Sequence, residues 1–166
     1  MTQEEFVRQV QANQGILQKI CRLYGQTAPD REDLFQEIVV QLWRALPKFQ
    51  GQSKFSTWMY RVALNTAISD FRKKRRALHV SGREVTSLEI RSELSEVSKE
   101  ERLDILYVAI SRLPEIETAI VMLYLENKSY DEMEDILGIS ANNLRVKMNR
   151  IKEKLRQLTK NISHGT

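Results

Sequence analysis

The sequence predicts an all-α protein made of two small helical domains joined by a polar linker. Apolar residues recur at three- and four-residue spacings along most of the chain, as in amphipathic helices, and no segment carries a strand signal. Only six Gly and three Pro interrupt the 166 residues. Residues 78–99 are rich in Ser, Glu and Arg and show no sustained period. We therefore expect domains at 1–77 and 100–166, with a linker at 78–99.

The N-terminal domain is predicted to be a helical bundle of three helices. Apolar side chains recur at helical spacing over residues 3–24, and Gly25 stops the pattern. Asp30 is the expected cap of a second helix, which Pro47 interrupts. After a short loop, a third helix is expected over 54–76.

The C-terminal domain is predicted to hold four helices, of which the last two form a helix-turn-helix. Order resumes at about Leu103, and Pro114 fits the first turn of the next helix. Residues 129–132 (SYDE) form a capping box for a short helix that ends at Gly138. Ser140 is expected to cap a longer final helix. A short helix, a Gly turn and a longer capped helix are the layout of a helix-turn-helix.

Composition argues against several classes of protein. No stretch approaches the roughly 18 apolar residues of a membrane span, and the N-terminus lacks a signal-peptide core, so we expect a cytoplasmic protein without membrane insertion. The one cysteine, Cys21, has apolar neighbours and should be a buried structural thiol. His79 and His164 fall in the predicted linker and tail, and the chain has no HExxH, paired cysteines or phosphate-binding Gly loop. We therefore expect no catalytic residues, metal or cofactor.

Charge is distributed unevenly along the chain, although the net charge is only +4. Segments 54–76 and 141–160 each carry seven bases and one acid. Between them, segment 84–104 carries three bases and seven acids, and segment 115–136 one base and seven acids. Two basic segments separated by acidic ones indicate two places that meet an anionic polymer.

The final helix has a face suited to a DNA major groove. One side is an apolar stripe made of Leu144, Met148, Ile151, Leu155 and Leu158. The opposite side presents Asn142, Val146, Asn149 and Arg150, flanked by Arg145 and Lys147. Asn can pair with adenine, Arg with guanine, and an exposed Val can touch a thymine methyl. Lys152, Lys154 and Arg156 are expected nearer to phosphates. The alternative is a plain amphipathic helix with a solvated basic face.

The helix at 54–76 combines aromatic residues with a polar arc. Phe55, Tyr60 and Phe71 are predicted to face the core, and Trp58 is the best candidate for an exposed stacking surface. The polar arc consists of Arg61, Asn65, Ser69 and Arg72. Such a stripe suits single-stranded or distorted DNA, where bases stack and phosphates need positive charge. The bases that follow, Lys73, Lys74, Arg75 and Arg76, are expected to grip backbone phosphates.

Two segments together resemble one bacterial family. DLFQEIVVQLWRALPKFQGQSKFSTWMYRVALNTAISDFRKKRR (33–76) resembles the second region of extracytoplasmic-function (ECF) sigma factors. LPEIETAIVMLYLENKSYDEMEDILGISANNLRVKMNRIKEKL (113–155) resembles their fourth region. Two blocks in the correct order are far more specific than either alone. The resemblance implies the compact two-domain class of sigma factors, which direct core RNA polymerase to promoters and begin DNA opening in response to stress or envelope signals.

The resemblance also assigns roles to residues. The helix at 31–46 would dock on a clamp coiled coil of RNA polymerase through Asp33, Gln36, Glu37, Val40, Gln41 and Arg44, although from spacing alone a solvated face is equally consistent. The single-stranded −10 element would meet Phe49, Gln50, Phe55, Trp58, Arg61, Asn65, Ser69, Arg72, Lys73, Lys74, Arg75 and Arg76. The duplex −35 element would meet Ser140, Asn142, Asn143, Arg145, Val146, Lys147, Asn149 and Arg150. An anti-sigma factor is a further implied partner.

One position departs from the family pattern. The first helix of the helix-turn-helix usually has a small residue four before the turn glycine, and this chain has Glu134. Either the two helices shift slightly, or Glu134 swings outward and finds a base.

Two other functions are consistent with parts of the sequence. A stand-alone helix-turn-helix regulator would explain 129–158 but would leave the polar arc of 61–72 without a role. An interaction protein whose helices bind an inhibitor or scaffold is the second alternative, and an enzyme is the weakest.

Overall fold

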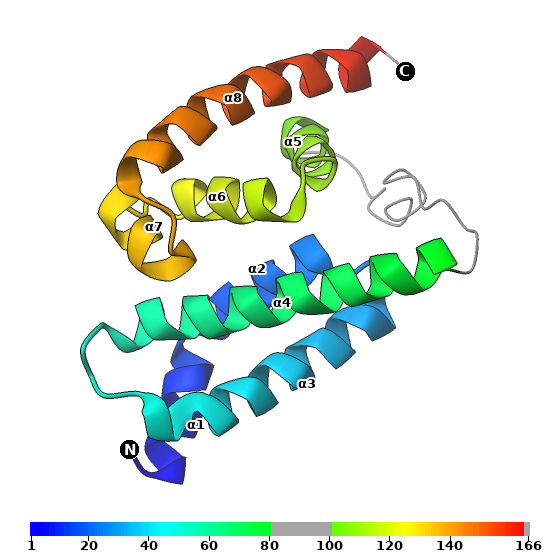
Figure 1. The fold of residues 1–166 in the computed structure, drawn as a ribbon. Helices are drawn as coiled ribbons and strands as arrows, with labels where there is room; N and C mark the ends of the chain where they lie inside the picture. Colours follow the sequence, from blue (N-terminus) through cyan, green and yellow to red (C-terminus); the bar gives the residue numbers. More distant parts are fainter. Residues whose placement is uncertain (81–100, 165–166) are drawn as a thin grey trace. The chain divides into compact units, whose positions relative to one another are not determined.

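The computed structural model describes residues 1–80 and 101–164 and is all-α over these ranges, as predicted. Eight α-helices and one short 3₁₀ turn make up the described chain, which contains no strand in these ranges (Figure 1). The chain divides into two compact units, Met1–Arg83 and Glu84–Thr166. The predicted linker lies mostly outside the described residues. Its first three residues, 78–80, continue a helix.

The N-terminal unit begins with two helices where one was predicted. α1 spans Gln3–Ala12 and α2 spans Gln14–Tyr24. The prediction of a single helix over 3–24 is wrong because Asn13 interrupts it: its side-chain amide donates to the Gln9 carbonyl at 2.7 Å. Asparagine side chains compete in this way with the helical hydrogen-bond pattern.

The rest of this unit is an antiparallel helical hairpin. α3 spans Ala28–Ala45, a 3₁₀ turn covers Leu46–Lys48, and α4 spans Phe55–Val80. α3 and α4 run side by side in opposite directions, and α2 packs on both (Figure 1). The cap of α3 is Thr27 and not Asp30, because the Asp30 amide donates to the Thr27 hydroxyl at 3.2 Å. Side chains from the three helices fill the core: Leu17, Ile20, Leu34, Ile38, Leu42, Met59, Tyr60 and Leu64.

The C-terminal unit is a four-helix domain, as predicted. α5 spans Glu101–Ser111, α6 spans Glu115–Leu125, α7 spans Tyr130–Leu137 and α8 spans Ala141–His164. The long α8 packs on each of the other three helices. Its core side chains include Ile110, Ile120, Leu123, Met133, Leu144 and Ile151.

The helix-turn-helix forms through the predicted caps. Ser129 and Glu132 make both hydrogen bonds of a capping box at the start of α7. Gly138 ends α7 with a φ of 71°, a conformation that glycine adopts without steric cost. The Ser140 hydroxyl then accepts a hydrogen bond from the Asn143 amide at 3.3 Å. These caps fix where α7 ends and α8 begins.

None of the helices in the described part of the chain combines the length and the apolar character that a membrane span requires.

Candidate nucleic-acid interfaces

The apolar stripe of α8 faces the core, as the sequence predicted. Leu144, Met148 and Ile151 are buried, whereas Leu155 and Leu158 are half-buried. The other side of the first three turns is exposed and carries Asn142, Asn143, Arg145, Val146, Lys147, Asn149 and Arg150. Val146 stands out among them, because an aliphatic side chain is 50% exposed in a polar surface. We call this exposed side the α8 face.

Arg145 is held in place at the N-terminal end of the α8 face. Its Nη1 donates to the Asn142 side-chain oxygen at 3.0 Å. The guanidinium carbon also lies 5.2 Å from the ring centroid of Tyr130, within the range of a cation–π interaction. Tyr130 comes from the first turn of α7 and was not among the predicted site residues. The sequence feature that could have pointed to Tyr130 is its position directly after Ser129, the capping residue of α7.

Glu134 caps the N-terminus of α8. Its carboxylate Oε2 accepts a hydrogen bond from the Ala141 backbone amide at 2.9 Å. The Glu134 side chain is exposed, in agreement with the expectation that it swings outward. Its partner, however, is a backbone N–H and not a basic side chain. The N-terminal amides of a helix lack intrahelical partners, so a nearby carboxylate satisfies one of them.

The basic side chains further along α8 contact other side chains of the C-terminal unit. Lys154 Nζ lies 2.7 and 3.0 Å from the two carboxylate oxygens of Glu117 on α6. Lys152 Nζ lies 4.9 Å from the ring centroid of Tyr124. Arg156 pairs with Glu153 one turn away at 3.3 Å. Lys154 and Arg156 thus form surface ion pairs within the unit, and the expectation that the three side chains lie near phosphates stays a prediction.

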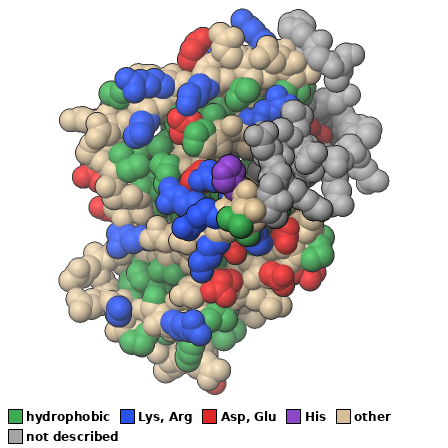
Figure 2. Space-filling view, turned by 45° about the vertical axis from the view of Figure 1, so that its right-hand side comes forward, with side chains coloured by type: hydrophobic (Ala, Val, Ile, Leu, Met, Phe, Trp, Pro, Cys, Tyr) green, Lys and Arg blue, Asp and Glu red, His purple; other side chains and the backbone are tan. Residues whose placement is uncertain are grey.

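The basic C-terminal turns of α4 form a second exposed surface. Arg72, Lys73, Arg75 and Arg76 are exposed. Lys74 differs, because its Nζ lies 3.2 Å from Asp70 and 3.6 Å from Asp30. In the space-filling view, Lys and Arg side chains gather near one histidine (Figure 2). The C-terminal turns of α4 carry five consecutive basic residues, 72–76.

The polar arc of α4 is exposed as predicted, but Trp58 is not. Arg61, Asn65, Ser69 and Arg72 all face solvent. The prediction of an exposed Trp58 is wrong, since its side chain is only 8% exposed. Tyr60 is buried as expected, whereas Phe55 and Phe71 are half-buried.

Trp58 is covered by an aromatic cluster that joins the loop to α4. The Phe49 ring centroid lies 5.1 Å from that of Trp58 and 5.8 Å from that of Phe55. Phe55 and Trp58 are 5.3 Å apart. The cluster therefore anchors the loop after the 3₁₀ turn onto the first turns of α4. Phe49 and Phe55 remain half-buried, while Gln50 is exposed on the same loop.

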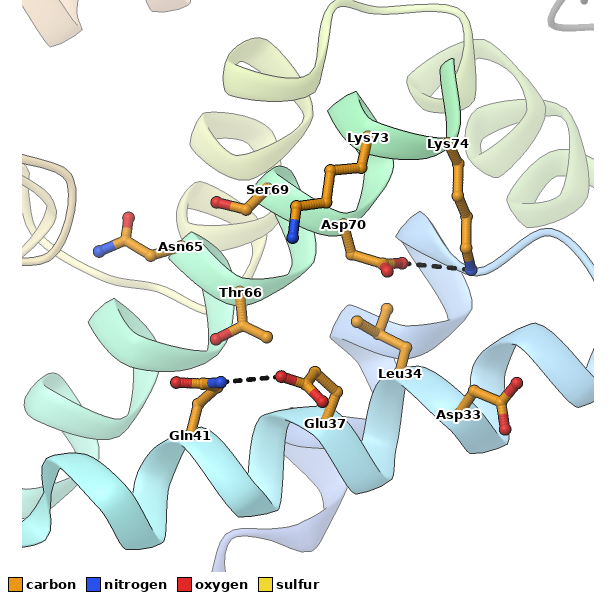
Figure 3. A pocket seen from close by; sticks show the side chains of 10 residues that line it. All are labelled: Asp33, Leu34, Glu37, Gln41, Asn65, Thr66, Ser69, Asp70, Lys73 and Lys74. Atoms are coloured by element: carbon orange, nitrogen blue, oxygen red, sulfur yellow. Dashed lines mark hydrogen bonds and ion pairs between the residues drawn. The ribbon is translucent and has the colours of Figure 1, made fainter. Parts of the chain in front are cut away.

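A polar groove separates the exposed sides of α3 and α4 (Figure 3). It has a volume of about 630 Å³. Asp33, Glu37 and Gln41 line it from α3, and Asn65, Ser69 and Lys73 line it from α4. Gln41 donates to Glu37 at 2.8 Å along the α3 wall. Lys74 lines the groove as well, so the structure brings three of the predicted polymerase-docking residues close to four of the predicted −10 residues. The other α3 candidates, Gln36, Val40 and Arg44, are exposed outside the groove lining.

Comparison with known proteins gives matches for both units. Residues 9–77 match the family model for Sigma-70 region 2, and residues 103–155 match that for Sigma-70 region 4. The ECF RNA polymerase sigma-E factor of Escherichia coli K12 is 31% identical over 148 residues, covering 81% of this chain and 78% of the relative. The same-named protein of Haemophilus influenzae is 28% identical over 135 residues, covering 75% of this chain and 71% of the relative.

Two solved structures share the fold. One is the sigma factor RpoE in complex with the anti-sigma factor NepR from Bartonella quintana. It has a TM-score of 0.75 and 19% identity, with 95% of this chain and 98% of that chain covered. The other is CnrH in complex with the cytosolic domain of CnrY, with a TM-score of 0.67 and 21% identity over 95% of this chain and 88% of that chain.

Proposed function

The chain belongs to the ECF sigma factors, promoter-specificity subunits of bacterial RNA polymerase, and from this premise we propose how its two units divide promoter recognition. The C-terminal unit reads the duplex −35 element, and the N-terminal unit captures the opened −10 element and docks on the polymerase. The polymerase supplies the catalysis. The observation that carries the proposal is the pair of exposed polar surfaces, one on each unit, within the segments that match regions 2 and 4.

The α8 face has the chemistry of a major-groove reader. Its amides and guanidinium groups can pair with base edges, and the exposed Val146 can contact a thymine methyl. The stripe on the opposite side is packed into the core, so the helix presents this face from a rigid support. Ser140 and Asn143 lie at the helix start, where side chains and backbone amides commonly contact phosphates.

The N-terminal unit has the features needed to hold single-stranded DNA. Arg61 and Asn65 lie on the exposed arc, and the half-buried rings of Phe49 and Phe55 lie at its N-terminal end. Trp58 packs against both rings. Because its own side chain is buried, it is not itself the stacking surface. Unpairing and unstacking cost a few kcal/mol per base, so capture of an extruded base offsets the opening of the first pairs. The Lys and Arg side chains of residues 72–76 supply positive charge for the adjoining phosphates.

The exposed side of α3 is the proposed docking surface for the polymerase. Asp33, Gln36, Glu37 and Arg44 give it mixed charge, and Val40 adds an apolar side chain that is 41% exposed. A polar rim around an apolar contact is a usual composition for a protein interface. Because α3 also forms one wall of the groove, polymerase docking and −10 capture would occur on neighbouring surfaces.

The proposed partners are core RNA polymerase, promoter DNA and an anti-sigma factor, and the proposed location is the cytoplasm, where polymerase and promoters are found. One of the solved structures with the same fold is a complex with an anti-sigma factor, and this supports a similar partner here.

A transcription assay tests the proposal. The purified chain is combined with core polymerase and a promoter library randomised at the −35 and −10 elements, and the transcripts are sequenced. We expect a defined pair of elements to be enriched. Arg145→Ala should change the preference at −35 only, and Asn65→Ala at −10 only. Absence of promoter-dependent transcripts, or exchanged effects of the two variants, would refute the proposal.

A further inference from the structure

Tyr130 has no role in the proposed division of promoter recognition, yet it contacts the side chain at the front of the α8 face. It is the first residue of α7, and the capping box formed by Ser129 and Glu132 fixes the backbone there. Its ring lies under the Arg145 guanidinium, with 5.2 Å between the ring centroid and Cζ. The ring is half-buried, whereas Arg145 is exposed. A fixed aromatic surface therefore supports a long side chain that would otherwise sample many rotamers.

A second contact restrains the same guanidinium. Arg145 Nη1 donates to the Asn142 side-chain oxygen at 3.0 Å. A guanidinium has five N–H donors in one plane. The guanidinium carbon lies over the Tyr130 ring, and Asn142 accepts from one of the donors. Enough donors remain for the two bonds by which Arg recognises guanine O6 and N7.

We propose that Tyr130 is a positioning residue that, with Asn142, preorganises Arg145 to read one guanine of the −35 element. The inference rests on the proposed function, in which the α8 face enters the major groove. Tyr130 acts through Arg145 and touches no base itself. An arginine that is already oriented loses less conformational freedom on binding, so the contact favours the guanine over the other bases.

The chain offers a matched control for this contact. Tyr124 supports Lys152 at 4.9 Å in the same kind of cation–π arrangement, within the same unit. Lys152 is not on the α8 face. Tyr124→Leu therefore removes an equivalent contact without disturbing Arg145.

The experiment measures base preference at each −35 position with holoenzyme and a −35 promoter library. Arg145→Ala should abolish a guanine preference at one position and so identify it. Tyr130→Leu should reduce the preference at that same position by roughly two- to fivefold, the value of a cation–π contact at an exposed site. Tyr130→Phe should retain it, and so should Tyr124→Leu. In the Arg145→Ala background, Tyr130→Leu should have no further effect on base preference.

Three results would overturn the inference. They are an unchanged guanine preference in Tyr130→Leu, a uniform loss at every −35 position, and the absence of any guanine preference that depends on Arg145. Thermal unfolding of each variant separates loss of the fold from loss of positioning. Tyr130→Gln provides a second test by replacing the ring with a polar side chain, and it should give the same selective loss. If the unsubstituted chain gives no promoter-dependent transcript, the proposed function itself fails; normal transcription that is indifferent to Tyr130 refutes this inference alone.

Discussion

The carboxylate of Glu134 has two opposing consequences for promoter recognition. It satisfies the Ala141 amide and places a negative charge at the positive end of the α8 dipole, both of which stabilise the helix-turn-helix. The same negative charge lies at the N-terminal end of the proposed reader, close to where DNA phosphates would come. In the proposed function, Glu134 would therefore lower the affinity for DNA while it stabilises the turn.

Two substitutions separate these effects. Glu134→Gln keeps a hydrogen-bond acceptor but removes the charge, so promoter binding by the holoenzyme should tighten, most clearly at low salt. Glu134→Ala removes the acceptor as well, and the free energy of unfolding of the C-terminal unit should fall by about 0.5–2 kcal/mol. Salt-dependent promoter affinity and thermal unfolding are the measurements. Equal promoter affinity in all three proteins would show that the charge does not reach the DNA.

Cys21 reports on the N-terminal core. Burial raises the pKa of its thiol from 9.0 to about 11, and the side chain is 3% exposed. At pH 8 roughly one thiol in a thousand is then ionised, and thiolate is the reactive form. Alkylation of the native protein should therefore be much slower than that of the urea-unfolded chain, as followed by mass spectrometry. The pKa of this thiol is higher in the folded protein than in the unfolded chain. The neutral buried thiol therefore makes its full contribution to the free energy of unfolding below pH 9, and this contribution is lost as the pH rises towards 11.

At the scale of the element, α4 shows what helical periodicity can and cannot predict. The spacing of apolar residues correctly gave the exposed arc of Arg61, Asn65 and Ser69, because a single helix has a fixed 100° step. It failed for Trp58, which lies at the edge of that arc and is buried by a ring from the preceding loop. A helical wheel contains no information about a loop that folds back. Asn13 escaped prediction for a similar reason, since its neighbours on both sides keep a helical period.

The aromatic cluster gives a prediction for this loop. Phe49→Ala removes two ring contacts, each worth about 0.5–1.5 kcal/mol beyond burial, so the N-terminal unit should lose roughly 1–3 kcal/mol of stability. Trp58 should become exposed, and its fluorescence should shift to longer wavelength. The measurement is best made in a Trp43→Phe background, because Trp43 is already 47% exposed and would mask the change. Unchanged Trp58 emission would mean that Phe49 does not cover the ring.

At the scale of the whole molecule, the proposed function depends on pairing two promoter-reading surfaces, one on each unit. The sequence predicted this pairing through its alternating charge, with basic segments at 54–76 and 141–160. The structure places the exposed arc of the first on α4 and the face of the second on α8, each supported by its own core. In the proposed function the polymerase sets the geometry between the units. Two weak readers held at a fixed spacing gain affinity through effective concentration.

A spacing experiment tests this division of labour. Inserting about five base pairs between the −35 and −10 elements turns one element by roughly half a DNA turn relative to the other. If the polymerase fixes the two units, promoter binding and transcription by the holoenzyme should fall sharply with this insert. Inserting about ten base pairs restores the rotation but not the distance, so transcription should stay low. The chain without polymerase should bind each of these duplexes weakly and with similar affinity, because its C-terminal unit meets the −35 element alone. Tight binding by the free chain that depends on the insert would mean that the linker and not the polymerase sets the spacing. A holoenzyme indifferent to the insert would mean that the spacing is not fixed at all.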